Sequence, residues 1–93
     1  MNRTDILTEA SRCITVDRNN IYGPPENSFG VVAAFWSAHL DHPVSATDVA
    51  AMMALFKLAR IKGNPSHVDS WVDGVGYLAL GGELATERRE ESA

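Results

Sequence analysis

The middle of the sequence contains two stretches in which apolar and charged residues recur three or four positions apart, a spacing that limits the chain to helices. Lys57 and Arg60 are three apart, so they share a face of the first expected helix. Asp69, Asp73 and Tyr77 are four apart each time, so they form a column along the next one. No part of the chain alternates with period two for long enough to indicate a strand. The sequence therefore predicts an all-α protein.

Four helices joined by short loops are expected, as a compact four-helix bundle in a single domain over residues 1–86. They begin near residues 5, 26, 46 and 67, and the last three end near Leu40, Gly63 and Leu84. Residues 87–93 form a charged C-terminal tail. The expected N-terminal caps are Thr4, Ser45 with Asp48, and Ser66 with Asp69.

Composition excludes several classes of protein. The net charge of −4 argues against a protein that binds duplex DNA, which needs a basic surface. No apolar run approaches the roughly 18 residues of a membrane span, and the N-terminus lacks the apolar block of a signal peptide. We therefore expect a cytoplasmic protein, with Cys13 as a buried, inert thiol. Because 45% of the residues are hydrophobic, more apolar helix surface exists than one small bundle can cover, which predicts a homo-oligomer.

The two cations and two carboxylates on the neighbouring helices have two possible interpretations. They form either an internal electrostatic clamp or the wall of a site for a charged ligand. A Mg²⁺ site would use Asp69 and Asp73, with Asp48 as a third ligand. Such sites usually need three or four converging carboxylates, and here Lys57 and Arg60 stand where further acidic residues would be required. We therefore expect no metal.

A second polar group brackets the proline-containing turn before the second helix. Arg18, Tyr22 and Asn27 lie close to a helix N-terminus, and together they make an anion site. The alternative is that Tyr22 packs under the turn and Arg18 is solvated. The three histidines have no Cys or His at ligand spacing, so a zinc site is not expected.

Across residues 10–85 the ordered pattern resembles a widespread family of short, uncharacterised phage and prophage proteins. The residues that carry the resemblance are Arg18, Tyr22-Gly23, Asn27, Trp36, Asp48-Val-Ala, Lys57, Arg60, Asp69-Ser, Asp73 and Gly76-Tyr77. The Asp-x-x-x-Asp-x-x-x-Tyr helix is also distantly similar to the all-α MazG-like nucleotide pyrophosphatases. The chain departs from their pattern because it lacks the paired-glutamate helix, and this departure argues against hydrolysis.

The resemblance implies that the polar residues form one ligand site: Arg18, Tyr22, Asn27, Lys57, Arg60, Asp69, Asp73 and Tyr77. Cations, carboxylates and an aromatic ring suit phosphate, ribose and base, so we expect a nucleotide or cyclic nucleotide ligand, bound without a cofactor or catalysis. By analogy with phage proteins that sequester nucleotide immune signals, the protein would counter a defence inside the bacterial host. The alternatives are a Mg²⁺-dependent pyrophosphatase assembled in an oligomer and a protein–protein inhibitor module.

Overall fold

The computed structural model describes residues 1–17 and 25–92, and within these ranges the chain is helical and contains no strand. The all-α prediction is confirmed, but two boundaries differ from it. The first helix changes at Cys13 into a wider π-helical segment, and the last helix continues well past Leu84. The elements are α1 (Arg3–Arg12), η1 (Cys13–Asp17), α3 (Pro25–Leu40), α4 (Ala46–Gly63) and α5 (Val68–Ser92).

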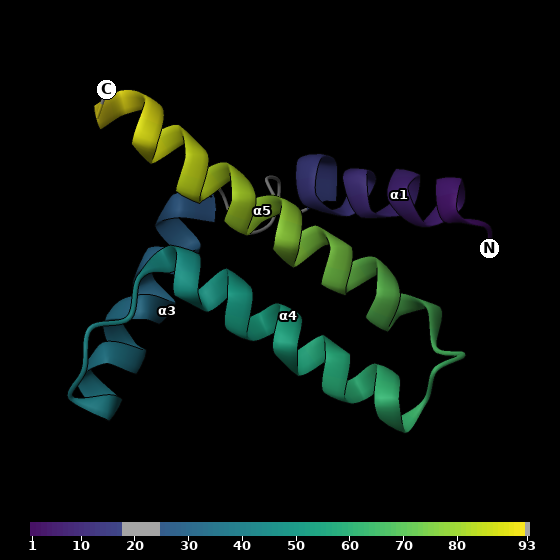
Figure 1. Ribbon diagram of the computed structural model, residues 1–93, viewed down its shortest axis with the longest axis horizontal. Helices are drawn as coiled ribbons and strands as arrows, with labels where there is room; N and C mark the ends of the chain where they lie inside the picture. The colour runs from purple at the N-terminus through teal and green to yellow at the C-terminus, as the bar shows by residue number, and fades with distance from the viewer. Residues whose placement is uncertain (18–24, 93) are drawn as a thin grey trace.

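The arrangement is organised around an antiparallel hairpin of α4 and α5, which have the most extensive contact of any two elements (Figure 1). On the far side of α5 from α4, α1 lies along its first half. At the other end of the hairpin α3 crosses the start of α4. Because α1 contacts α5 but neither α3 nor α4, the described helices cover the hairpin on some sides only.

The buried core lies where α3 meets the hairpin. It consists of Phe29, Ala33, Val49, Ala50, Leu80 and Leu84. Small residues let the helices approach closely there. A Cβ at Gly81 would lie 3.0 Å from the Cβ of Ala50, and a Cβ at Gly76 would lie 2.9 Å from Cγ2 of Ile14 in η1. Close helix contact therefore explains these two glycines, despite the cost of about 1 kcal/mol of a glycine within a helix.

The helix caps agree with the sequence at one of three places. Ser45 and Asp48 form the predicted capping box at the start of α4, with both reciprocal hydrogen bonds at 3.0 Å. At the start of α1 the cap is Asn2, whose side chain accepts a hydrogen bond from the backbone of Asp5. The prediction of Thr4 was wrong by two positions, since asparagine is as good an N-cap as threonine or better.

The turn between α4 and α5 is fixed by side-chain hydrogen bonds. The predicted capping pair Ser66 and Asp69 does not form: the Ser66 hydroxyl donates to the side-chain oxygen of Asn64, 3.0 Å away. Nε1 of Trp71 donates to the carbonyl oxygen of Pro65 at 2.9 Å, which ties the first turn of α5 back to the loop. These contacts hold the hairpin at its closed end.

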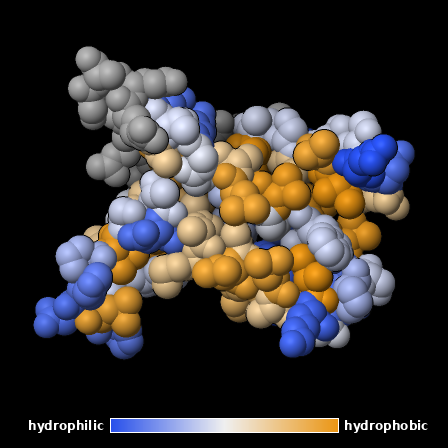
Figure 2. Space-filling model, in the orientation of Figure 1, coloured by the Kyte–Doolittle hydropathy of each residue, from blue (hydrophilic) through white to orange (hydrophobic). Residues whose placement is uncertain are grey.

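Many large apolar side chains remain exposed. Met52, Phe56 and Trp71 are bulky enough to serve as core residues, but all three are exposed, and so is Phe35. Figure 2 shows hydrophobic residues gathered over the middle of the hairpin. None of the described helices has the length and apolar character needed to cross a membrane.

Candidate functional site

Five of the predicted site residues belong to the two helices of the hairpin: Lys57 and Arg60 of α4, and Asp69, Asp73 and Tyr77 of α5. Their spacing of three or four residues gives each set a common side of its helix, and we call the side on which they lie the polar face. The two helices are joined there by an ion pair. Nζ of Lys57 lies 3.0 Å from Oδ2 of Asp73, with side chains that are 19% and 39% exposed. Of the two interpretations that the sequence left open for these charges, the ion pair favours an electrostatic clamp at this position.

The register of the hairpin explains why these residues meet. A Cβ at Gly74 would lie 3.8 Å from the Cβ of Lys57, so the two positions are level. Seven residues earlier on α4, Ala50 is level with Gly81, seven residues later on α5. The helices therefore run antiparallel without a shift between these points, and Arg60 is level with the turn of α5 that separates Asp69 from Asp73.

An aromatic ring lies beside the two cations, at a position that was not among the predicted site residues. Cζ of Arg60 and Nζ of Lys57 each lie 5.8 Å from the ring centroid of Phe56, within the range of a cation–π interaction. Half of the surface of Phe56 is exposed, so the ring is accessible on this side of α4. The signal was available, because Phe56 and Arg60 are four residues apart and so share a helix face.

Tyr77 continues the polar face toward α3. Its ring is half-buried, and the centroid lies 6.2 Å from that of Phe29 with the planes tilted by 35°. Because part of the ring packs against a buried core residue, Tyr77 is held in place by the fold. It is therefore a rigid member of the column that begins with Asp69 and Asp73.

The remaining predicted residues are not brought to this face by the described structure. Arg18 and Tyr22 lie outside the described residues, and Asn27 belongs to the first turn of α3 but its side chain is not described. Asp48 is at the opposite end of the hairpin from Asp69: it is level with Glu83, ten residues beyond Asp73, or about 15 Å along the helix. Among the described residues no three His, Cys, Asp or Glu side chains are grouped so that they could hold a metal ion.

Cys13 has polar neighbours rather than the apolar surroundings expected of it. It is partly buried, and its Sγ lies 3.9 Å from Oε1 of Glu9 and 3.9 Å from Nη2 of Arg12. Glu9 and Arg12 form an ion pair with each other. The hydrogen bond from Arg12 is the main cause that lowers the pKa of Glu9 from its usual value.

Fold and geometry thus define a small all-α protein with a clamped polar face on a helical hairpin. The chain belongs to the family described as domain of unknown function DUF6378, whose model matches residues 5–85. It is 44% identical over 72 residues to the Gene 55 protein of Mycobacterium phage D29, covering 77% of this chain and 48% of that protein. It is 39% identical over 77 residues to the Gene 55 protein of Mycobacterium phage L5, covering 81% and 49%.

These comparisons support a phage family of uncharacterised proteins, as the sequence pattern predicted. The chain spans about half the length of the curated relatives it matches. No solved structure matches it.

Proposed function

We propose that this domain binds a nucleotide or a nucleotide-derived signal at the polar face, without converting it, in the service of the phage against host defence. The observation that carries the proposal is the Lys57–Asp73 ion pair, 3.0 Å long, which keeps the charged positions of α4 and α5 on one side of the hairpin. Arg60 and Asp69 lie on the same side within about one helical turn of that pair.

The chemistry of each position fits part of a nucleotide. Arg60 is exposed and presents a planar guanidinium, which binds phosphate in a bidentate manner. The exposed carboxylate of Asp69 would accept hydrogen bonds from ribose hydroxyls, and the exposed Phe56 ring offers a surface on which a base can stack. Lys57 is already paired with Asp73, so we assign it to positioning rather than to direct phosphate contact.

The Mg²⁺-dependent pyrophosphatase has less support. The likeness of this chain to MazG-like enzymes rests on the spacing of Asp69, Asp73 and Tyr77 in the sequence. The third carboxylate named for that site, Asp48, lies near the other end of the hairpin, and Lys57 already neutralises Asp73. A Mg²⁺ site here would need acidic ligands from outside the described residues of one chain.

The experiment is thermal melting of the protein against a panel of nucleoside triphosphates and cyclic nucleotides, with and without Mg²⁺, followed by an assay for released phosphate. A ligand at 100 times its Kd stabilises the native state by about 2.7 kcal/mol, which raises the melting temperature measurably. We expect a rise that does not need metal and is not accompanied by turnover.

Variants locate the site. Arg60→Ala should abolish the shift, whereas the matched control Arg3→Ala, which removes an exposed arginine from α1, should leave it unchanged. A Mg²⁺-dependent shift with product release would establish the pyrophosphatase instead. If no nucleotide changes the melting temperature, the proposal fails and the protein–protein module becomes the better explanation.

A further inference from the structure

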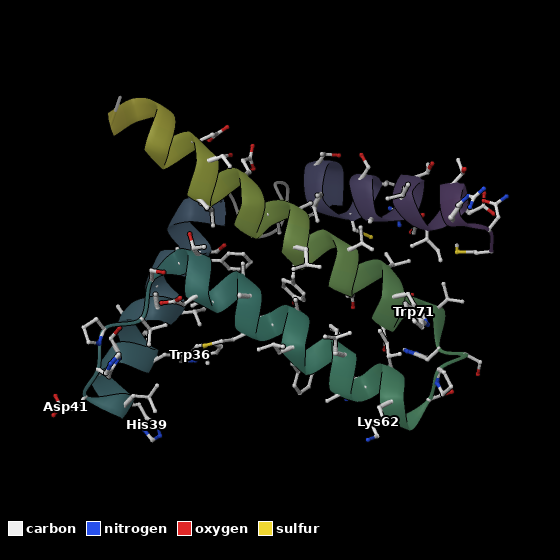
Figure 3. The ribbon with its side chains drawn as sticks, viewed as in Figure 1. Trp36, His39, Asp41, Lys62 and Trp71 are labelled. Atoms are coloured by element: carbon white, nitrogen blue, oxygen red, sulfur yellow. The ribbon has the colours of Figure 1, made fainter. Side chains whose placement is uncertain are left out.

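The opposite side of the hairpin carries an apolar groove, which we call the hairpin face. It is lined by Ala51, Leu55 and Leu58 of α4 and by Trp71, Val75 and Leu78 of α5, and its volume is about 430 Å³. Leu55, Leu58 and Leu78 are 63%, 57% and 64% exposed. Figure 2 looks onto this region, and Figure 3 places Trp71 near the closed end of the hairpin and Lys62 at the end of α4.

An uncovered face of this kind is unfavourable in water. Burying a leucine side chain is favourable, and soluble monomers rarely leave several large apolar side chains together at the surface. The molecule is also more open than a closed bundle: its radius of gyration is 14.0 Å, whereas a compact chain of this length has about 12 Å. Something is therefore expected to cover the hairpin face.

The charges at the ends of the groove on α4 indicate what covers it. Asp48 lies seven residues before Leu55 and Lys62 lies seven residues after it, so all three fall on one side of the helix, two turns apart. Both charged side chains are exposed. A second α4 that packs antiparallel about a two-fold axis at Leu55 would bring each Asp48 level with the Lys62 of the other copy. The side of α4 that carries Asp48, Leu55 and Lys62 is thus complementary in charge to the same side of a second copy.

The groove side of α5 is complementary in side-chain size to the same side of a second copy. Leu55 is level with Gly76, so the same two-fold axis passes α5 at Gly76. Trp71 lies five residues before this point and Gly81 five residues after it, with Gly82 next on the groove side. A Cβ at Gly82 would meet nothing within 4 Å, so space is open there. The axis would therefore set the bulky Trp71 of each copy against the open space at Gly82 of the other, next to Gly81.

We propose that the hairpin face binds the hairpin face of a second copy of this chain, forming an antiparallel two-fold dimer with its axis at Leu55. The inference goes beyond the proposed function and is independent of it. Asp69, Asp73 and Tyr77 occupy the other side of α5 from Trp71, Val75 and Leu78, so the dimer leaves the polar face accessible. Lys57 borders both faces: its stem lines the groove and its Nζ reaches Asp73.

The first test is sedimentation equilibrium of the wild-type chain, of Leu55→Glu and of Leu7→Glu. Leu7 is a matched control, since it is a leucine that is 60% exposed on α1, outside the hairpin face. We expect a wild-type dimer, a Leu55→Glu monomer with unchanged helical circular dichroism, and a dimer for Leu7→Glu. The Kd for dissociation of the dimer should rise at least about tenfold in Leu55→Glu, which is equivalent to 1.4 kcal/mol. A monomeric wild-type chain, or a dimer that survives Leu55→Glu, overturns the proposal.

Disulfide trapping tests the orientation in a Cys13→Ser background. Across a two-fold axis at Leu55, Leu55→Cys should cross-link to itself, because two cysteines bridge only when their Cα atoms are within about 7 Å. Asp48→Cys and Lys62→Cys should each remain uncross-linked alone and should form a mixed dimer when combined. Self-cross-linking of Asp48→Cys and of Lys62→Cys would instead show a parallel pairing and would overturn the antiparallel dimer. Failure of either test leaves the nucleotide assay unaffected.

Discussion

Lys57 and Asp73 join the two long helices by an ion pair whose nitrogen and oxygen are 3.0 Å apart. The aliphatic stem of Lys57 packs against Gly74: a Cβ added at Gly74 would lie 3.8 Å from the Cβ of Lys57. The side chain therefore belongs to two environments, an apolar groove along its stem and a polar face at its charged end. Such a division is usual for lysine, whose stem is apolar and whose head prefers water or a carboxylate.

The ion pair should contribute little to stability, whatever its value for placing charges. We expect a double-mutant cycle with Lys57→Met and Asp73→Asn, measured by urea unfolding, to give a coupling of no more than about 1 kcal/mol. The carboxylate is 39% exposed, so solvent and salt screen the attraction. The coupling should shrink further in 1 M NaCl. A coupling of several kcal/mol that is insensitive to salt would mean that the pair is far more desolvated than its exposure indicates.

The sequence predicted the helices well because their signals are local. Ser45 and Asp48 are three residues apart, and the capping box they form depends on nothing outside that turn. The choice of Asn2 over Thr4 was missed because both residues are good caps and only two positions separate them. An ion pair between the two helices was one of two alternatives that the charge spacing left open, and its two members could be assigned only once the register of the hairpin was known.

The hairpin face could not be predicted for a different reason. Leu55 and Leu58 belong to a helix that is apolar on most sides, and such a helix is typical of a buried one. Whether another element of the same chain covers the side of α4 that carries Leu55 and Leu58 depends on how α1 and α3 are placed. That placement is a long-range property of the chain. In the structure α1 packs on α5 and α3 on the start of α4, so none of the described helices covers that side.

A pair of glycine substitutions tests the close approach of η1 to α5. Gly76→Ala should destabilise the fold, because the new Cβ would lie 2.9 Å from Cγ2 of Ile14 on a neighbouring element. Gly30→Ala in α3 is the control: nothing lies within 4 Å of its Cβ position, so the substitution should stabilise the helix by up to about 1 kcal/mol. Urea unfolding measures both. Equal effects of the two substitutions would contradict the tight contact at Gly76.

Tyr77 offers a way to separate structure from binding on the polar face. Tyr77→Phe keeps the ring that packs 6.2 Å from Phe29 and removes only the hydroxyl, so the melting temperature without ligand should change little. If Tyr77 contacts a bound nucleotide through that hydroxyl, Kd should rise by roughly tenfold, the equivalent of one lost hydrogen bond of about 1 to 1.5 kcal/mol. Titration calorimetry gives Kd. An unchanged Kd would remove Tyr77 from the ligand site and leave it a packing residue.

The capping box at the start of α4 makes part of the stability depend on pH. The backbone N–H of Ser45, and then its hydroxyl, donate to the Asp48 carboxylate and lower its pKa below the usual value of 3.8. Because the folded-state pKa is the lower one, this contribution is present above the unfolded pKa of about 4 and is lost as the pH falls through the folded value. Urea midpoints measured from pH 6 down to pH 2 should therefore drop less in Asp48→Asn than in the wild type.

Ser45→Ala should lie between these two, because it removes the hydroxyl but keeps the backbone donor, and at neutral pH it should cost about 1 kcal/mol. All three proteins are best compared in the Leu55→Glu background, so that any contact between Asp48 and Lys62 of a second copy is absent. A wild-type pH profile that matches that of Asp48→Asn would show that the carboxylate is not stabilised by the cap. If the urea midpoint depends on pH only in proteins that retain Leu55, the pH dependence belongs to the dimer and not to the cap.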